Sequence, residues 1–168
     1  SAMRCATRFI AFAAGLAFAA AAAQAAGSVQ VSFVQPEKFS DAEDDRHDSS
    51  QNLRELKRYL EVQAARHVGD GQTLTIEVLD VDLAGELRFD RSRAADVRVL
   101  LGMADWPRIK LRYTLESTGQ PVRRVEQTVS DMAYLDRMNR YADGEMLRHE
   151  KRMLDEWFEA QFGRAAAK

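Results

Sequence analysis

The chain has 168 residues, of which 46% are hydrophobic, and its 24 Lys and Arg stand against 26 Asp and Glu. This composition excludes a disordered chain, which needs few apolar residues, and a protein built from several membrane spans. The net charge of −2 also disfavours a general nucleic-acid binder, which needs an excess of basic residues.

The N-terminal segment has the pattern of a secretory signal peptide behind a two-residue remnant, Ser1-Ala2. Arg4 and Arg8 form a positive region, residues 9–23 are uncharged and mostly apolar, and Ala23-Gln24-Ala25 places small residues where signal peptidase requires them. The apolar run is too short and too rich in Ala for a membrane anchor, which needs roughly 20 apolar residues. We therefore expect export to the periplasm and no transmembrane span in the mature chain.

Residues 1–25 also hold the single cysteine, Cys5, which precedes the apolar run and so cannot be the acylated cysteine of a lipoprotein. The remaining chain, residues 26–168, has 143 residues, 22 Lys and Arg, 26 Asp and Glu, and a net charge of −4. Without cysteine it has no disulfide, no thiolate zinc site and no cysteine nucleophile. Its length suits one domain with a packed core.

The first elements of this domain are a strand and a helix. Apolar residues alternate with polar ones over residues 28–33, which predicts a half-buried strand ended by Pro36. The acidic stretch from Asp41 to Asp48 has no apolar period and is predicted as a loop. Ser49 or Ser50 then caps a helix, whose apolar residues recur every three or four positions until Gly69-Asp70-Gly71.

The middle of the chain predicts two strands with a charged loop between them. Residues 73–83 alternate, but the apolar residues change parity halfway, which we interpret as a central strand whose two ends are covered differently. Residues 88–93 are charged and are predicted as loop. Residues 97–101 predict a short strand that ends at Gly102, and its pattern is the weakest of the set.

The last part of the chain predicts a hairpin and a helix. Residues 109–115 alternate most clearly, and residues 125–129 return antiparallel after a turn at 117–121. A helix opens near Asp143 and closes at Gly163. Together the elements predict one α+β domain, with an antiparallel or mixed sheet of four to five strands and two main helices packed on it.

The last helix is predicted to be amphipathic, with its apolar residues packed on the sheet. Arg148, Lys151, Arg152 and Asp155 are assigned to its polar side, where they form ion pairs or guide a partner. Both tryptophans, Trp106 and Trp157, are assigned to the core.

Three acidic residues form the first candidate site. Asp80 and Asp82 share one side of a strand, about 6–7 Å apart at the usual rise, and Glu86 follows them. Two carboxylates at this separation suit acid–base chemistry or glycoside hydrolysis. The favoured alternative is structural, because acids at a strand end also bind turn amides or pair with arginine.

Three basic residues form the second candidate site. Arg108, Lys110 and Arg112 share one side of a strand, and either Arg123 or Arg124 of the hairpin partner joins them. Such a row suits an anionic ligand, since arginine makes bidentate contacts with phosphate or carboxylate. The favoured alternative is a solvated face, which Glu116 and Glu126 neutralise.

Other chemistry finds less support in the sequence. The acidic stretch of residues 41–48 carries oxygen ligands that suit Ca²⁺, but it lacks the glycine of a calcium loop, so whether it binds a cation stays open. His47, His67 and His149 are too far apart in sequence for a helical zinc motif. No nucleophile elbow and no glycine-rich phosphate loop occurs. The sequence thus predicts no metal site and no cofactor.

Five segments along the chain carry a resemblance to a known family. They are Val31-Ser32-Phe33-Val34 with Pro36-Glu37-Lys38-Phe39, Val78-Leu79-Asp80-Val81-Asp82-Leu83-Ala84-Gly85, Asp105-Trp106-Pro107-Arg108-Ile109, Ser130-Asp131-Met132-Ala133-Tyr134-Leu135 and Glu150-Lys151-Arg152-Met153-Leu154-Asp155-Glu156-Trp157-Phe158. The chain resembles the bacterial secreted family catalogued as domain of unknown function 3016. The resemblance implies a small exported Gram-negative protein, and it implies no activity, cofactor or catalytic residue.

Two classes of function follow from these patterns. The preferred one is a non-enzymatic periplasmic binding or envelope accessory module, which uses an exposed sheet face or the last helix to bind an envelope component or a periplasmic protein. The alternative is a small hydrolase or metal-dependent enzyme that uses Asp80, Asp82 and Glu86. The sequence leans away from an enzyme and leaves the partner and the oligomeric state open.

Overall fold

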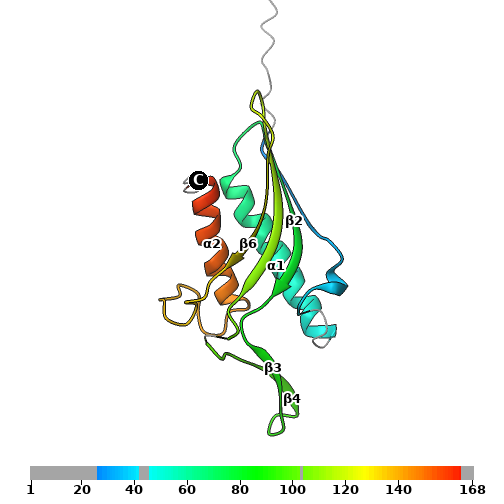
Figure 1. Cartoon of the computed structure of the whole chain (residues 1–168), viewed down its shortest axis with the longest axis vertical. Coiled ribbons are helices and arrows are strands. Elements are labelled where there is room, and N and C mark those ends of the chain that lie inside the picture. Colours follow the sequence, from blue (N-terminus) through cyan, green and yellow to red (C-terminus); the bar gives the residue numbers. More distant parts are fainter. Residues whose placement is uncertain (1–25, 42–45, 103, 164–168) are drawn as a thin grey trace, which may run out of the picture.

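The computed structural model describes residues 26–41, 46–102 and 104–163, so the predicted signal peptide lies outside the described residues. The elements in chain order are β1 (Ser28–Phe33), the short 3-10 helix η1 (Pro36–Lys38), α1 (Arg46–His67), β2 (Gln72–Asp82), β3 (Glu86–Asp90), β4 (Ala95–Val99), β5 (Arg108–Ser117), β6 (Arg123–Ser130) and α2 (Arg148–Phe162) (Figure 1). This is a single α+β domain, as the sequence predicts.

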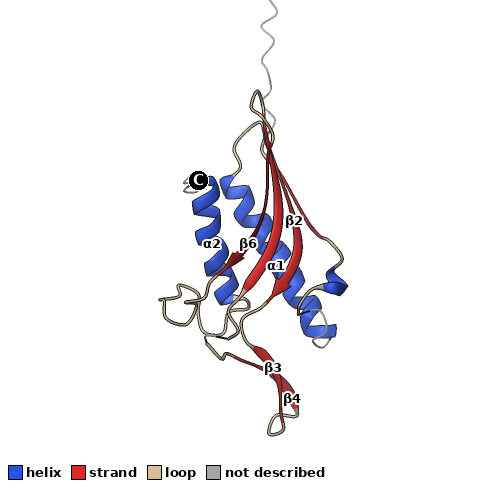
Figure 2. Cartoon of the chain, in the orientation of Figure 1, coloured by secondary structure: helices blue, strands red, loops and turns tan. Residues whose placement is uncertain are grey.

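The main sheet has four strands in the order β1-β2-β5-β6, and it is mixed, because β1 runs parallel to β2 while the other neighbours are antiparallel. The predicted hairpin of residues 109–129 is confirmed as β5 and β6. A second, two-stranded sheet of β3 and β4 projects from the end of the domain (Figure 2). We call residues 86–99 the arm.

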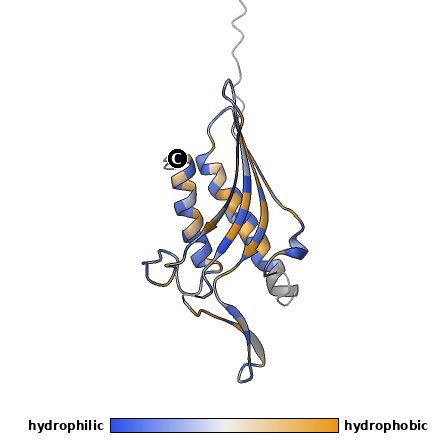
Figure 3. Ribbon diagram, viewed as in Figure 1, coloured by the Kyte–Doolittle hydropathy of each residue, from blue (hydrophilic) through white to orange (hydrophobic). Residues whose placement is uncertain are grey.

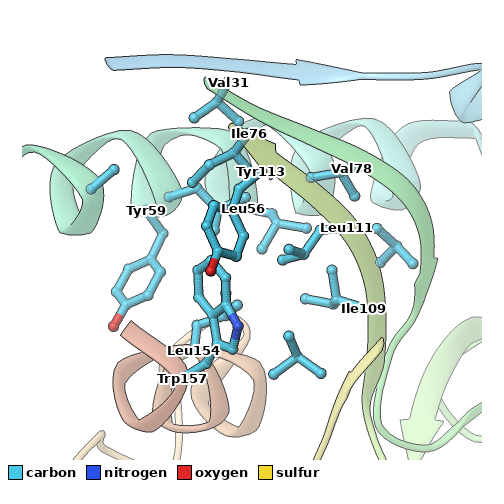
Figure 4. Packing of buried hydrophobic residues seen from close by; sticks show 14 of the residues in the cluster. Val31, Leu56, Tyr59, Ile76, Val78, Ile109, Leu111, Tyr113, Leu154 and Trp157 are labelled. Atoms are coloured by element: carbon cyan, nitrogen blue, oxygen red, sulfur yellow. The ribbon is translucent and has the colours of Figure 1, made fainter. Parts of the chain in front are cut away.

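Both helices lie on one face of the main sheet, where the core forms. The inward residues of β2 and β5 are fully buried, and the apolar sides of α1 and α2 pack against them; Figure 4 shows Leu56, Ile76, Leu111, Leu154 and Trp157 in this cluster. Apolar and hydrophilic residues alternate along the strands (Figure 3). Trp157 is 6% exposed, which confirms its prediction as a core residue. Trp106 is only half-buried, so its assignment to the core is wrong.

A β-bulge explains the change of parity in β2. The register pairs Val78 with Leu111 but Asp80 with Lys110, so Leu79 is an extra residue. Because of this extra residue, Val81 and Leu83 face the same core as Val78. Our expectation that the two ends of the strand are covered differently is therefore wrong. The bulge corrects the parity, so a single core-facing side runs through the whole strand.

Three element boundaries differ from the sequence prediction. Only residues 91–93 of the loop expected over residues 88–93 form a turn, because residues 88–90 belong to β3, which pairs with β4 in a hairpin. The helix α1 begins at Arg46, inside the predicted acidic loop, of which residues 42–45 are not described. The helix α2 begins at Arg148, later than predicted, because residues 131–147 form an irregular segment that we call the cover.

Candidate functional site

The outward face of the main sheet carries charged residues, and no described helix or strand covers it. Alternation along β5 places Arg108, Lys110 and Arg112 on this side, as predicted, while Ile109 and Leu111 face the core. The register sets Asp82 opposite Arg108 and Glu77 opposite Arg112 on β2. We call this surface, with Glu126 of β6, the charged face.

Each basic residue of the charged face pairs with an acid on a neighbouring strand. Arg108 binds Asp82, and Arg112 donates from Nε to Glu77 at 2.8 Å. Glu126 lies between Lys110 and Arg112, at 3.1 and 3.7 Å. The Arg112 guanidinium lowers the pKa of Glu77. The row is therefore a mosaic of both charges instead of a basic patch.

The second strand of the hairpin adds one arginine to the charged face. Arg124 lies opposite Thr114 and donates to its hydroxyl, whereas Arg123 lies on the other side, over the ring of Tyr113 and bonded to Gln161. This arrangement agrees with the prediction that only one of Arg123 and Arg124 lies on the same side as Arg108, Lys110 and Arg112.

The charged face ends at a hollow beside the base of the arm, about 420 Å³ in volume. Four acids and one arginine contribute to its lining, and we call it the basal hollow; the complete lining is Asp41, Asp82, Gly85, Glu86, Ala104, Asp105 and Arg108. Two of the predicted acidic residues, Asp82 and Glu86, therefore meet one of the predicted basic residues, Arg108, in the same place.

Several of these acids hold the backbone where β2 passes into the arm. Asp41 accepts from the amide of Leu83 at 2.5 Å, and the Asp105 carboxylate accepts from the amide of Leu101 and from the Tyr134 hydroxyl. The amide of Gly85 donates to the carbonyl of Asp105. Carboxylates thus satisfy amides that no strand partner reaches.

Two further side chains form hydrogen bonds with the backbone of residues 84–85. Arg98 donates to the carbonyls of Ala84 and Gly85 and lies 3.6 Å from Asp41. Glu150, in the first turn of α2, accepts from the amide of Ala84 at 2.8 Å and is fully buried. Gly85 has a φ of +83°, and a Cβ there would lie 2.6 Å from the carbonyl oxygen of Val99. Only glycine fits this position.

Only two of the three predicted acidic residues lie in the basal hollow. Asp80 is not part of the hollow lining; its carboxylate accepts from the amide and hydroxyl of Ser40, at 2.7 and 2.8 Å. Asp82 is paired with Arg108, and Glu86 is exposed and lies 3.3 Å from Arg88. Among the described residues, no three His, Cys, Asp or Glu side chains form a group able to hold a metal ion.

The charged side of α2 is buried, and its assignment to an exposed polar side is wrong for three of four residues. Lys151, Arg152 and Asp155 are at most 9% exposed, because the cover lies over them. Arg152 pairs with Asp131 and donates to carbonyls of Tyr134, Arg137 and Met138; only Arg148 is partly exposed.

A polar network joins the two helices next to this pair. The Asp155 carboxylate accepts from the hydroxyls of Tyr59 and Tyr141 and pairs with Arg140. Burial raises the pKa of the Tyr59 hydroxyl, with a further contribution from the hydrogen bond to Asp155. A tyrosine that holds its proton this firmly serves as a structural donor. The sequence carries no sign of this network, whose residues come from three separate segments.

The described part of the chain has no helix that is both long enough and apolar enough to cross a membrane. The overall class is thus a small two-layer α+β domain with an open charged face and a projecting arm. The family model described as "Protein of unknown function (DUF3016)" matches residues 27–160, which include every strand that the structure describes and most of α2. The chain belongs to this family, and the resemblance in the sequence is confirmed. No curated protein and no solved structure shows a significant match.

Proposed function

We propose that the protein is exported to the periplasm, where it acts as a non-enzymatic accessory module that binds another protein through the charged face. The observation that carries this proposal is the open side of the sheet. Both helices pack on the opposite side, so this face is open to solvent and presents a fixed pattern of charges.

The pattern favours a protein partner over a purely anionic ligand. Arg108, Lys110 and Arg112 already have carboxylates within 4 Å, so an anion would have to compete with them. A protein surface offers both charges and can exchange pairs with the mosaic without leaving an acid unpaired. Such complementarity provides specificity and rapid association.

The contacts of the acidic residues support a binding function over the hydrolase alternative. Asp80 is bonded to Ser40 and Asp82 to Arg108, while Asp41 and Asp105 bind backbone amides. A general acid or base needs a carboxylate that can reach substrate. The test of the alternative is direct: Asp82→Asn would abolish any hydrolysis that depends on this site.

Position-specific crosslinking in cells tests the binding face. A photoreactive amino acid at Lys110, whose side chain is 49% exposed, should give one discrete protein adduct, and Arg112→Glu should remove it. The matched control is Lys57 on α1, which is 48% exposed and lies away from the face. Equal adducts from both positions, or an adduct that survives Arg112→Glu, would contradict the proposal.

Fractionation of cells tests the location separately. We expect the protein in the periplasmic fraction with an N-terminus at Ala26, because Ala23 and Ala25 give the small residues that signal peptidase requires. Arg4→Glu with Arg8→Glu should leave the uncleaved chain in the cell. A wild-type chain that stays cytoplasmic and keeps its first 25 residues would refute the export proposal.

A further inference from the structure

The arm is a two-stranded ribbon that stands apart from the main sheet. Among the described strands, β3 and β4 pair only with each other, and neither joins the main sheet (Figure 1). An isolated hairpin is marginally stable in water, because each strand has only one neighbour. The outer edges of β3 and β4 also face no other described strand, and free edges favour pairing with another chain.

Apolar side chains are exposed along the arm and at its base. Phe89 is 64% exposed, although it lies within β3, and Leu100 and Leu101 are each 41% exposed where β4 leaves the ribbon. Leu135 of the cover lies near Gly102 and is 48% exposed, so it continues the apolar surface. An exposed aromatic on a strand of this kind is typical of an interface.

Charge differs between the two ends of the arm. Its tip presents the exposed residues Arg91 and Arg93 beside Asp90. Its base adjoins the basal hollow, whose four carboxylates stand against Arg108, with Arg98 near Asp41 and Arg88 near Glu86. Within the described part of the chain Arg91 forms no ion pair, while Arg93 lies 3.6 Å from Asp90. Arg91 at the tip and Glu86 at the base, whose side chain is 60% exposed, therefore have opposite charges and are separated by the length of the ribbon.

We propose that the arm docks on the arm of a second copy of this chain, as a two-fold dimer in which the two ribbons lie antiparallel. A two-fold axis across the ribbon places each tip beside the partner's base, so both copies make the same contact. Five-residue strands span about 17 Å, which sets the distance between the two tip contacts. The basic tip of each arm then lies against the acidic basal hollow of the other.

The dimer accounts for the free edges, the exposed aromatic and the opposite charges of the arm at once. Pairing along the outer edge of β3 turns two ribbons into a four-stranded sheet, and Phe89 gains a cross-strand neighbour from the partner on the same face of that sheet. The basal hollow shares Asp82 and Arg108 with the charged face, but the dimer needs no other protein, so this inference does not depend on the proposed function. A different protein that binds the arm would cover Phe89, but it would not require a tip and a base of opposite charge.

A charge-swap experiment tests the dimer by sedimentation of the purified protein. Arg91→Glu gives a tip that repels the acidic base, and Glu86→Arg gives a base that repels the basic tip. We expect each variant alone to self-associate at least tenfold more weakly than the wild type, because both tip contacts become repulsive. An equimolar mixture of the two variants should associate again, since every tip then faces a base of opposite charge.

Controls separate this contact from general effects of charge and hydrophobicity. Arg66→Glu makes the same change of charge at an exposed position of α1, away from the arm, and should leave self-association unchanged. Phe89→Ser should also weaken the dimer at least tenfold, whereas Val62→Ser, at an exposed apolar position of α1, should not. A monomeric wild type at millimolar concentration, a dimer insensitive to Phe89→Ser, or a mixture that stays monomeric would each overturn the proposal.

Discussion

At the scale of single residues, Arg152 is a charged side chain whose burial has to be compensated by an ion pair and hydrogen bonds. Its side chain is 6% exposed, and it binds the Asp131 carboxylate, itself 7% exposed, together with three carbonyls of the cover. Two charges removed from water are tolerated when the pair is close and further hydrogen bonds support it. Both Nη atoms of Arg152 make such bonds, whereas its Nε has no partner among the described residues. Arg152 therefore holds the cover on α2.

Replacing Arg152 by Met should lower the free energy of unfolding by about 3–5 kcal/mol, because Asp131 and three carbonyls lose their donor under the cover. Urea unfolding at pH 7 measures this loss. The control Lys57→Met removes a charge from an exposed pair whose atoms lie 4.0 Å apart, and its effect should stay below about 1 kcal/mol. Similar losses for both variants would contradict this account of Arg152.

Glu150 makes the stability of the folded domain decrease as the pH rises. Burial raises the pKa of its carboxyl, and the amide of Ala84 and the charge of Arg98 only partly oppose this effect. The folded state therefore holds the proton more tightly than the unfolded state. This stabilising contribution is complete below the unfolded pKa of about 4.5 and is lost as the pH rises towards the folded value.

The variant Glu150→Gln should consequently be more stable than the wild type at pH 7. Its amide oxygen still accepts from Ala84, but no charge has to be buried. The difference should shrink as the pH falls to 4, where the wild-type carboxyl is protonated in the folded state and largely so in the unfolded state. Urea unfolding between pH 4 and pH 8 measures the trend. A difference independent of pH would show that ionisation of Glu150 has no part in it.

At the scale of elements, α1 and α2 are joined by charge as well as by the apolar core. Glu55 of α1 contacts Arg58 at 2.7 Å on its own helix and Lys151 of α2 at 2.8 Å. The hydrogen bond from Arg58, followed by that from Lys151, lowers the pKa of Glu55 to about 2, although desolvation opposes them. The ionised carboxylate thus stabilises the helix pair.

The Glu55 contribution should disappear in acid. Since its folded pKa is about 2 and its unfolded value 4.5, the stabilisation is complete above 4.5 and is lost as the pH falls towards 2. Glu55→Gln should therefore be less stable than the wild type at pH 7 and nearly equal to it close to pH 2. The control is Glu61→Gln, which removes an exposed carboxylate 4.0 Å from Lys57 on the same helix and should change the stability by less than about 1 kcal/mol at pH 7. Acid titration followed by circular dichroism distinguishes the two variants.

At the scale of the whole molecule, the domain and its arm differ in stability. The core strands are buried between the helices and their neighbours, whereas the arm depends on its own ladder alone. In hydrogen exchange at low protein concentration, amides of β2 and β5 should exchange only on global unfolding and those of β3 and β4 much faster. Uniform protection across both sheets would contradict this division.

The proposed dimer makes the exchange of the arm depend on concentration. Raising the protein concentration should slow exchange in β3 and β4 selectively, because edge amides gain partners in the second copy. The Phe89→Ser variant is the control, and its arm should exchange quickly at every concentration.

The sequence predicts those elements whose packing partner follows the same local period. Strands β1, β5 and β6 alternate because one side faces the helices and the other faces water, and this also places Arg108, Lys110 and Arg112 together. The sequence also predicts that Glu126 neutralises this row, and Glu126 does lie beside Lys110 and Arg112. It does not predict that Arg108 pairs with Asp82 and Arg112 with Glu77, because the pairing of β2 with β5 is a long-range register. The sequence identifies the candidate acids but not the groups that they bind, because a partner such as Ser40 of Asp80 lies in a turn that is far away in the sequence.

The predictions for the arm and for the charged side of α2 are wrong because the packing there does not follow a local sequence period. The arm stands apart from the main sheet, so the charged run at 88–93 shows no pattern of a half-buried strand. The charged side of α2 looks solvated because residues 131–147, which bury it, have no period of their own. Local periodicity describes the surface on which an element packs, and it does not detect an irregular segment that covers the other side.

The cover also has a consequence for the rate at which the molecule opens. Closing residues 131–147 over α2 removes the charged groups of Arg152 and Asp155 from water, and their pairs with Asp131 and Arg140 offset the cost of desolvation. Opening the cover readmits water to these groups. We therefore expect Arg152→Met to increase the rate of unfolding, which sets how long the chain stays folded.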